Sequence, residues 1–255
     1  MYKGHRVAVV MPIHNERPRI ERAISRVPSF VDSIIAVDDA STDGTWGTLS
    51  RITNSKLIKL RHEKNRGVGA ATKTGYRHCL GTEPDLIAVM DGDGQMDGRD
   101  LSKLLDRAIT GVDYVKGNRF LHSQSLSSMP AARYAGNLFF SWLTCQAMGH
   151  AGSLDAQCGY TVIRMAALRR IALDRLYDRY GFPNEMLFAA SDAGLIVESV
   201  PVRSIYEDEV SGINPFTAVP MILFLIAKSY LRALLSVEAS KTIFVTQESE
   251  TNSTK

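Results

Sequence analysis

The chain has 255 residues, of which 45% are hydrophobic and 22% are charged, and its formal net charge is +3. These proportions are those of an ordinary globular protein, and they exclude an intrinsically disordered, collagen-like or disulfide-scaffold chain. The length suits one large α/β domain, and we find no linker or internal repeat that would divide it. Three scattered cysteines favour a reducing compartment over a disulfide framework or a zinc site.

Strand-like apolar runs alternate with helical segments in the first half of the chain. Strands are expected at 7–11, 33–37, 56–60, 86–90 and 113–116. Helices are expected at 15–27, 46–52, 70–80 and 100–109. Further along, helices are expected at 131–148, 165–171 and 184–190, and strands at 160–163 and 195–200. This alternation predicts an α/β fold with a mostly parallel sheet and helices on both faces.

No stretch of the sequence reaches the roughly 20 mostly apolar residues that a membrane-spanning helix needs. The N-terminus leads directly into the first apolar strand, so we expect no signal peptide and a cytoplasmic protein. Residues 51–77 carry eight basic side chains, but Tyr76 is the only Phe, Tyr or Trp among them. We therefore expect a solvated face there and no nucleic-acid binding.

Polar side chains gather where three of the expected strands end. Residues 14–16 follow the first strand, Asp38 and Asp39 the second, and residues 91–95 the fourth. Ligands of open parallel sheets bind outside the carboxyl ends of the strands. The sequence therefore predicts one site at this edge.

The segment Asp91-Gly92-Asp93-Gly94-Gln95 is the first candidate for a metal site. Mg²⁺ and Mn²⁺ prefer oxygen ligands, and Mg²⁺ usually takes one or two carboxylates together with substrate phosphates. The glycines permit a sharp turn and the close approach of a phosphate. An Asp-Gly turn with solvated carboxylates is the alternative interpretation. An EF-hand calcium loop is excluded, because no distal glutamate follows at the required spacing.

Three motifs in this order resemble family 2 glycosyltransferases, which have the GT-A fold. They are Met11-Pro12-Ile13-His14-Asn15-Glu16, Val37-Asp38-Asp39-Ala40-Ser41-Thr42-Asp43-Gly44-Thr45 and Met90-Asp91-Gly92-Asp93-Gly94-Gln95. The resemblance covers residues 7–120 and continues more loosely to about 215. It implies that a nucleotide diphosphate sugar is bound by Pro12, His14, Glu16, Val37, Asp39, Asp91, Gly92, Asp93 and Arg119. Asp39 would accept a hydrogen bond from a ring N–H of the base, and Asp91, Asp93 and Gln95 would hold Mg²⁺ or Mn²⁺ on the pyrophosphate. Many members have Tyr or Phe where His14 stands, which leaves the base open.

The second half resembles the polyprenyl-phosphate hexosyltransferase branch, typified by dolichol-phosphate mannosyltransferase. The matching residues are Lys116-Gly117-Asn118-Arg119-Phe120, Arg133 and Asp155-Ala156-Gln157-Cys158-Gly159-Tyr160. The resemblance implies that Asp93, Arg119 and Arg133 are catalytic and that Arg133, Asn137 and Asp155 bind the acceptor. A surface salt bridge is the alternative for each arginine, and Cys158 is expected to be packed rather than nucleophilic.

Acceptor chemistry distinguishes two enzyme hypotheses. A sugar hydroxyl needs a general base, whereas a lipid monophosphate is already an anion near neutral pH and needs cations that position it. The arginines favour the lipid phosphate, but Asp155, Glu185 and Asp192 leave a hydroxyl acceptor open.

The sequence beyond residue 215 predicts a separate C-terminal segment. Residues 216–246 suit an amphipathic helix at a membrane interface, with a core-packed helix and a dimer contact as alternatives. Residues 247–255 are expected to form a disordered tail. The predicted GT-A domain would thus occupy residues 1–215.

The sequence favours a metal-dependent inverting transferase that moves a hexose from a nucleotide diphosphate sugar to dolichyl or undecaprenyl phosphate at the cytosolic membrane face. Two alternatives remain, a family 2 enzyme that glycosylates a hydroxyl of a cell-surface polysaccharide and a non-catalytic nucleotide-sugar binding module. GDP-mannose and UDP-hexose are both open as donors, as are a homo-oligomer and a membrane-bound protein partner.

Overall fold

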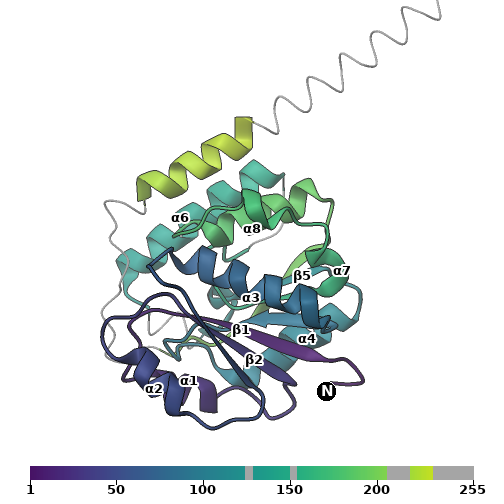
Figure 1. Ribbon diagram of the computed structural model, residues 1–255. Coiled ribbons are helices and arrows are strands. Elements are labelled where there is room, and N and C mark those ends of the chain that lie inside the picture. Colours follow the sequence, from purple (N-terminus) through teal and green to yellow (C-terminus); the bar gives the residue numbers. More distant parts are fainter. Residues whose placement is uncertain (124–128, 150–153, 206–218, 232–255) are drawn as a thin grey trace, which may run out of the picture.

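The computed structural model describes residues 1–123, 129–149, 154–205 and 219–231 (Figure 1). Within α6, the side chains of residues 132 and 133 are outside the described part. The predicted tail at 247–255, and residues 216–218 and 232–246 of the predicted C-terminal segment, also lie outside it. The domain boundary at residue 215 therefore stays a prediction.

The described residues form one mixed sheet. Its strands are β1 (Val7–Ile13), β2 (Ser33–Asp38), β3 (Leu57–Arg61), β4 (Leu86–Val89), β5 (Tyr114–Asn118), β6 (Thr161–Arg164) and β7 (Val197–Pro201), in the order β3-β2-β1-β4-β6-β5-β7. Neighbouring strands are parallel except at β6, which runs antiparallel to both β4 and β5. The predicted mostly parallel sheet is confirmed.

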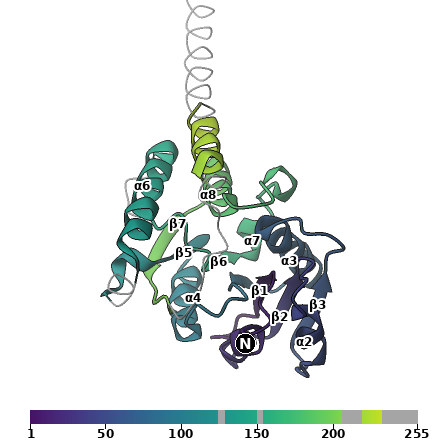
Figure 2. The same cartoon turned by 90° about the vertical axis from the view of Figure 1, so that its left-hand side faces the viewer.

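Helices cover both faces of this sheet (Figure 2). The helices are α1 (Ile20–Ser25), α2 (Thr45–Arg51), α3 (Val68–Thr82), α4 (Leu101–Ile109), α6 (Ala131–Met148), α7 (Met165–Leu168) and α8 (Phe182–Asp192), with 3₁₀ turns at Gly98–Asp100, Arg119–Leu121 and Leu173–Arg175. Alternate side chains of β1 enter two separate cores. Ala8 and Val10 pack with residues of α3, α7 and α8, whereas Val7 and Val9 pack with residues of α1, α2 and α4. A strand buried on both faces explains the continuous apolar run of β1.

The first helix begins later than the sequence predicts. A helix was expected from Asn15, but α1 starts at Ile20. Asn15 instead has a left-handed backbone, with φ of 57°. The reason is tertiary, because the loop after β2 binds the backbone of residues 15–17 through side chains, as described below.

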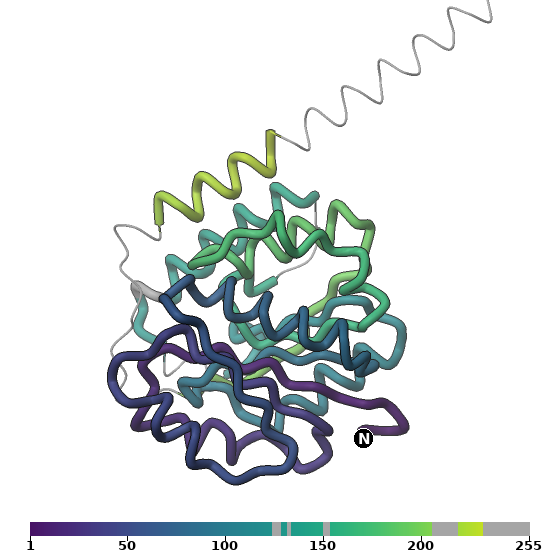
Figure 3. The backbone as a smooth tube through the Cα atoms, in the orientation of Figure 1, coloured from purple at the N-terminus to yellow at the C-terminus, as the bar shows by residue number. Residues whose placement is uncertain are grey.

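A helical segment at residues 219–231 packs on the end of the molecule formed by α6 and α8, and it is the yellow part of the backbone trace (Figure 3). Ile222 and Ile226 are buried against Ala147 of α6 and Phe188 of α8. No helix in the described part of the chain is both long and apolar enough to cross a membrane.

A tight contact between α3 and β1 supplies the first prediction. A Cβ at Gly75 would lie 2.3 Å from Cγ1 of Val10, so α3 can approach the sheet this closely only with glycine. Gly75→Ala is expected to lower the free energy of unfolding by about 1–3 kcal/mol, because the added carbon overpacks the core. Urea denaturation measures this loss.

Gly81 in the same helix provides the matched control. It is exposed, and a Cβ there would meet nothing within 4 Å. Gly81→Ala is therefore expected to stabilise the protein by up to about 1 kcal/mol through helix propensity. Equal effects of the two substitutions would show that the α3–β1 approach is not constrained.

Candidate functional site

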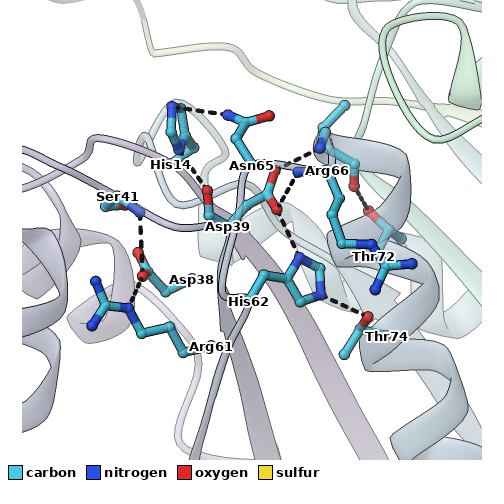
Figure 4. Close-up of polar contacts among 12 residues, drawn as sticks. His14, Asp38, Asp39, Ser41, Arg61, His62, Asn65, Arg66, Thr72 and Thr74 are labelled. Carbon is cyan, nitrogen blue, oxygen red and sulfur yellow. Dashed lines mark hydrogen bonds and ion pairs between the residues drawn. The ribbon is translucent and has the colours of Figure 1, made fainter.

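Three polar side chains form a row at the carboxyl edge of the sheet. The last residues of β1, β2 and β3 are neighbours in register, so His14, Asp39 and His62, which follow them, lie side by side (Figure 4). His14 Nδ1 is 2.8 Å from the carbonyl oxygen of Asp39, and His14 Nε2 is 3.0 Å from Nδ2 of Asn65. A carbonyl oxygen only accepts, so Nδ1 donates to it and Nε2 accepts from the Asn65 amide. The exposed His14 ring is thereby oriented at the edge of the site.

Asp39 connects this row to the loop between β3 and α3. Its carboxylate is buried, and Oδ1 accepts from Nδ1 of His62 at 2.7 Å and from the backbone N–H of Arg66 at 2.9 Å. Oδ2 accepts from the backbone N–H of Gly67 at 2.6 Å. A carboxylate offers about four acceptor positions. These donors use three of them, and the position that remains is on Oδ2.

The second motif also organises the loop of the first. Ser41 Oγ accepts from the backbone N–H of Asn15 at 2.9 Å, and Thr45 Oγ1 accepts from that of Glu16 at 2.8 Å. Asp43 accepts from the backbone N–H of Arg17 at 3.1 Å. The Ser, Asp and Thr of this motif therefore hold the residues that follow β1 and so shape the candidate nucleotide pocket.

Pro12 and Val37 lie beneath this row rather than in it. They are paired in the register of β1 and β2, and both side chains are buried. The Val37 side chain belongs to the hydrophobic core, so a nucleotide could reach this residue only through its backbone. The carbonyl of Pro12 accepts from the backbone N–H of Gly92 at 3.1 Å. Their predicted role in lining the pocket stays a prediction.

The segment after β4 lies beside the end of β1. Asp91, Asp93 and Gln95 are partly exposed, and Gly92 and Gly94 between them are buried. A Cβ at Gly92 would lie 2.9 Å from Cγ1 of Ile13, which explains the glycine there. Asp93 Oδ1 accepts from the backbone N–H of Gln95 at 2.8 Å, and this bond holds the turn. The alternation presents three oxygen-bearing side chains at the same edge.

Negative charge is concentrated around this segment. Burial raises the pKa of Asp91 to about 7, and the carboxylates of Asp93 and Glu16 act in the same direction. Burial also raises the pKa of Asp93 and of Glu16. Within the described ranges, no group of three or more His, Cys, Asp and Glu side chains is placed to hold a metal. Two mutually repelling carboxylates with an amide nevertheless fit a hard divalent cation that takes its remaining ligands from phosphate and water.

Arg119 forms a buried ion pair at the end of β5. Its Nε lies 2.6 Å from Oδ2 of Asp155, and its Nη2 lies 2.9 Å from Oδ1. Asp155 is fully buried, whereas the Arg119 side chain is 15% exposed. The bridge is therefore not the surface contact considered as an alternative. The acceptor-binding role predicted for Asp155 stays a prediction, since this geometry gives its carboxylate the task of holding Arg119.

The predicted acceptor residues Arg133 and Asn137 both lie on α6. The Arg133 side chain is outside the described part of the structure. Asn137 is partly buried, with Nδ2 3.9 Å from Sδ of Met129. The acceptor-binding role of these two residues stays a prediction.

Glu185 and Asp192, the candidate bases for a hydroxyl acceptor, lie on α8. Glu185 is buried, and its Oε1 is 4.0 Å from Nζ of Lys228 on the C-terminal helical segment. Asp192 is exposed at the end of α8. Neither is part of the polar row at the ends of β1, β2 and β3.

The structure adds three residues that the sequence did not indicate. His62 and Asn65 bind Asp39 and His14, and the register of parallel strand ends was the signal that could have found His62. Tyr180 is the third. Partial burial raises its pKa and the carboxylates of Asp91 and Glu16 add to the rise, although the residue is 44% exposed. No periodicity or motif in the sequence marks this tyrosine.

Comparisons with known proteins agree with this geometry. The family model described as Glycosyl transferase family 2 matches residues 8–176. UDP-N-acetylglucosamine–dolichyl-phosphate N-acetylglucosaminyltransferase of Methanococcus voltae is 28% identical over 218 residues, which cover 79% of this chain and 86% of that protein. Undecaprenyl-phosphate mannosyltransferase of Micrococcus luteus is 29% identical over 220 residues, which cover 81% and 88%.

A solved structure shows the same fold. Glucosyl-3-phosphoglycerate synthase of Mycobacterium tuberculosis, in complex with Mn²⁺, UDP and glucosyl-3-phosphoglycerate, matches with a TM-score of 0.64 and 18% identity over 90% of this chain and 80% of that one. The predicted GT-A fold is thereby confirmed. Because the family model spans well over half of the chain and includes all three motifs, the chain belongs to glycosyl transferase family 2.

Proposed function

We propose that the chain transfers a sugar from a nucleotide diphosphate sugar to the phosphate of a polyprenyl lipid, with inversion at the sugar. The observation that carries this proposal is the position of Arg119. Asp155 holds its guanidinium, and the charge of Arg119 opposes the rise in the pKa of Asp91 that burial causes, so a fixed cation lies near the carboxylates of the third motif. Such a cation suits a phosphate acceptor, which needs positioning rather than deprotonation. The names of the relatives from Methanococcus voltae and Micrococcus luteus support the same acceptor class.

The donor would lie along the polar row. His14 and Asp39 would contact the base, with the remaining acceptor position of Asp39 Oδ2 receiving a ring N–H. Pro12 and Val37 would contribute backbone, and Glu16 and Gly92 would flank the pyrophosphate. A panel of UDP- and GDP-sugars identifies the base and the sugar of the donor.

Asp91, Asp93 and Gln95 would hold Mg²⁺ or Mn²⁺. A divalent cation there supplies Lewis-acid stabilisation of the departing nucleoside diphosphate. Arg119, with Arg133, would bind the donor pyrophosphate and the acceptor phosphate, and a fixed guanidinium fork suits such oxygens. Holding the two anionic substrates together is the main task of these side chains, because their phosphates repel each other.

The lipid acceptor gives a role to an exposed apolar surface on α6 and residues 219–231. Phe139 and Trp142 of α6 are 51% and 57% exposed, and Phe224 and Leu231 are 61% and 59% exposed. Helices with large exposed apolar side chains and flanking cations such as Lys228 suit the membrane interface. We infer that this surface rests on the cytosolic face of the membrane while the opposite side of the C-terminal helix packs on α8.

The two alternatives lack comparable support. A hydroxyl acceptor would need a general base, and Glu185 faces Lys228 instead. A non-catalytic binding module would not require the metal-type set Asp91, Asp93 and Gln95, which is complete and partly exposed here.

The activity is tested with labelled UDP- and GDP-sugars, Mn²⁺ and undecaprenyl or dolichyl phosphate. A labelled lipid extractable into butanol is the expected product, and Asp93→Asn is expected to lower its rate of formation by about 100-fold or more. Asp106→Asn, which alters an exposed ion pair with Lys3, should leave the rate unchanged. Donor binding without labelled lipid, for every donor tried, would contradict the proposed acceptor.

The pKa of Asp91 predicts a pH dependence of stability in the metal-free protein. Its folded-state pKa of about 7 lies above the ordinary value of 3.8, so the contribution to stability is complete below pH 4 and is lost as the pH rises through 7. Asp91→Asn is neutral at every pH. At pH 8 this variant should therefore be more stable than the wild type, by on the order of 2–4 kcal/mol. At pH 4 the difference in the free energy of unfolding should be much smaller.

Thermal unfolding in the presence of a chelator at several pH values measures this difference. A constant difference between variant and wild type from pH 4 to pH 8 would show that Asp91 is not destabilised by ionisation.

Membrane contact is tested by flotation with anionic phospholipid vesicles. Trp142→Ser with Phe224→Ser is expected to reduce the floated fraction at least about threefold, because two large apolar side chains leave the interface. Ile196→Ser removes a side chain that is 55% exposed and lies outside α6 and residues 219–231, so it serves as the control. Equal flotation of both variants would argue against the proposed surface.

A further inference from the structure

His62 lies between Asp39 and α3. Its Nδ1 is 2.7 Å from Oδ1 of Asp39, and its Nε2 is 2.9 Å from Oγ1 of Thr74 (Figure 4). The ring is buried, as is the carboxylate that it binds. None of the three sequence motifs contains this residue.

These contacts define the proton positions on the ring. An ionised carboxylate can only accept, so Nδ1 carries the proton and donates it to Asp39. Nε2 forms its hydrogen bond with the Thr74 hydroxyl, so both ring nitrogens have a partner. His62 is therefore hydrogen-bonded at both ends, to the polar row on one side and to α3 on the other.

A backbone hydrogen bond also holds His62 in place. Its N–H donates to the carbonyl of Asp38 at 2.9 Å, which continues the pairing of β2 and β3 by one residue. Four and five residues later, the N–H groups of Arg66 and Gly67 bind the carboxylate of Asp39. Asp39 therefore joins the two ends of the loop 62–67. Within the described part of the chain, His62 is the only side chain that donates a hydrogen bond to this carboxylate.

We propose that His62 is a positioning residue for the donor nucleotide, because it holds the Asp39 carboxylate so that Oδ2 points to the base and Asn65 stays against His14. His62 itself does not contact the nucleotide. This inference rests on the proposed function, since it assumes that the polar row binds the base of a nucleotide diphosphate sugar. A carboxylate that is already oriented loses less freedom when the nucleotide binds, so the advantage is in affinity.

Replacing His62 by asparagine or by glutamine tests which of its two ring nitrogens matters. Asn carries its amide nitrogen one bond from Cγ, as Nδ1 of histidine does, whereas Gln places it where Nε2 would be. His62→Asn can therefore keep the bond to Asp39 and lose that to Thr74, and His62→Gln has the opposite pattern. Thr74→Val removes only the hydroxyl on the α3 side.

The measurement is calorimetric titration of UDP and of GDP in the presence of Mn²⁺, using whichever nucleotide the wild type binds. His62→Gln is expected to raise the dissociation constant roughly 10- to 100-fold, and His62→Asn and Thr74→Val by less than about threefold. The KM for the donor should follow the dissociation constant, while kcat at saturating donor stays within about twofold, because His62 does not touch the third motif.

Several outcomes would overturn the inference, and they are separable from failure of the proposed function. If the wild type binds neither nucleotide, the proposed function and the role of His62 are both contradicted. A second outcome is that the wild type binds the nucleotide and Asp39→Asn weakens this binding, while His62→Gln binds it like the wild type. That result would contradict only the role of His62. If His62→Asn and His62→Gln weaken binding equally and lower the melting temperature equally, His62 is a structural residue without a specific bond to Asp39.

Discussion

The register of the three parallel strands β1, β2 and β3 is the constraint on which the site depends. Because each strand ends beside its neighbour, His14, Asp39 and His62 form a continuous row. Asp39 connects this row by its carbonyl and its carboxylate, and the carboxylate also closes the loop that leads into α3. A slip of one residue between β2 and β3 would reverse the faces of the side chains and remove His62 from Asp39. The hydrophobic pattern of the strands therefore also determines the geometry of the polar edge.

Charge is separated across the site. Burial raises the pKa of Asp91, and the nearby carboxylates of Asp93 and Glu16 add to this rise, whereas Lys116 and Arg119 oppose that shift from the end of β5. Lys116 is fully buried, and its Nζ donates to the carbonyl of Cys158 at 2.7 Å. Burial lowers the pKa of this lysine to about 8. A site with acidic groups at one end and basic groups at the other suits a dication and several phosphates at once, since each would lie near protein groups of the opposite charge.

The chain between the 3₁₀ turn Leu173–Arg175 and α8 contacts both the C-terminal helical segment and α3. A Cβ at Gly181 would lie 2.6 Å from Cδ1 of Leu225, so the helix packs directly on this stretch. The carbonyl of Asp178 accepts from the backbone N–H of Ala70 in the first turn of α3. Tyr180 lies between these two contacts in the sequence, and its pKa is raised by burial and by the carboxylate of Asp91. The apolar surface proposed to meet the membrane and the polar edge proposed to bind the donor therefore share one segment of chain.

The sequence by itself determined the layer architecture, the edge of the sheet that carries the polar motifs and the family. Apolar runs of strand length followed by helical periods allow few other folds, and the carboxyl ends of parallel strands must meet. Tertiary structure alone decided which groups bind one another. It placed Asn15 in a left-handed conformation and moved the start of α1 to a later residue than expected. The reason is that Ser41 and Asp43 accept hydrogen bonds from the backbone of the loop that precedes α1. It paired Asp155 with Arg119 and brought His62 to Asp39 from a position without a motif. Local patterns specify elements, whereas contacts between residues far apart in sequence arise only when those elements pack.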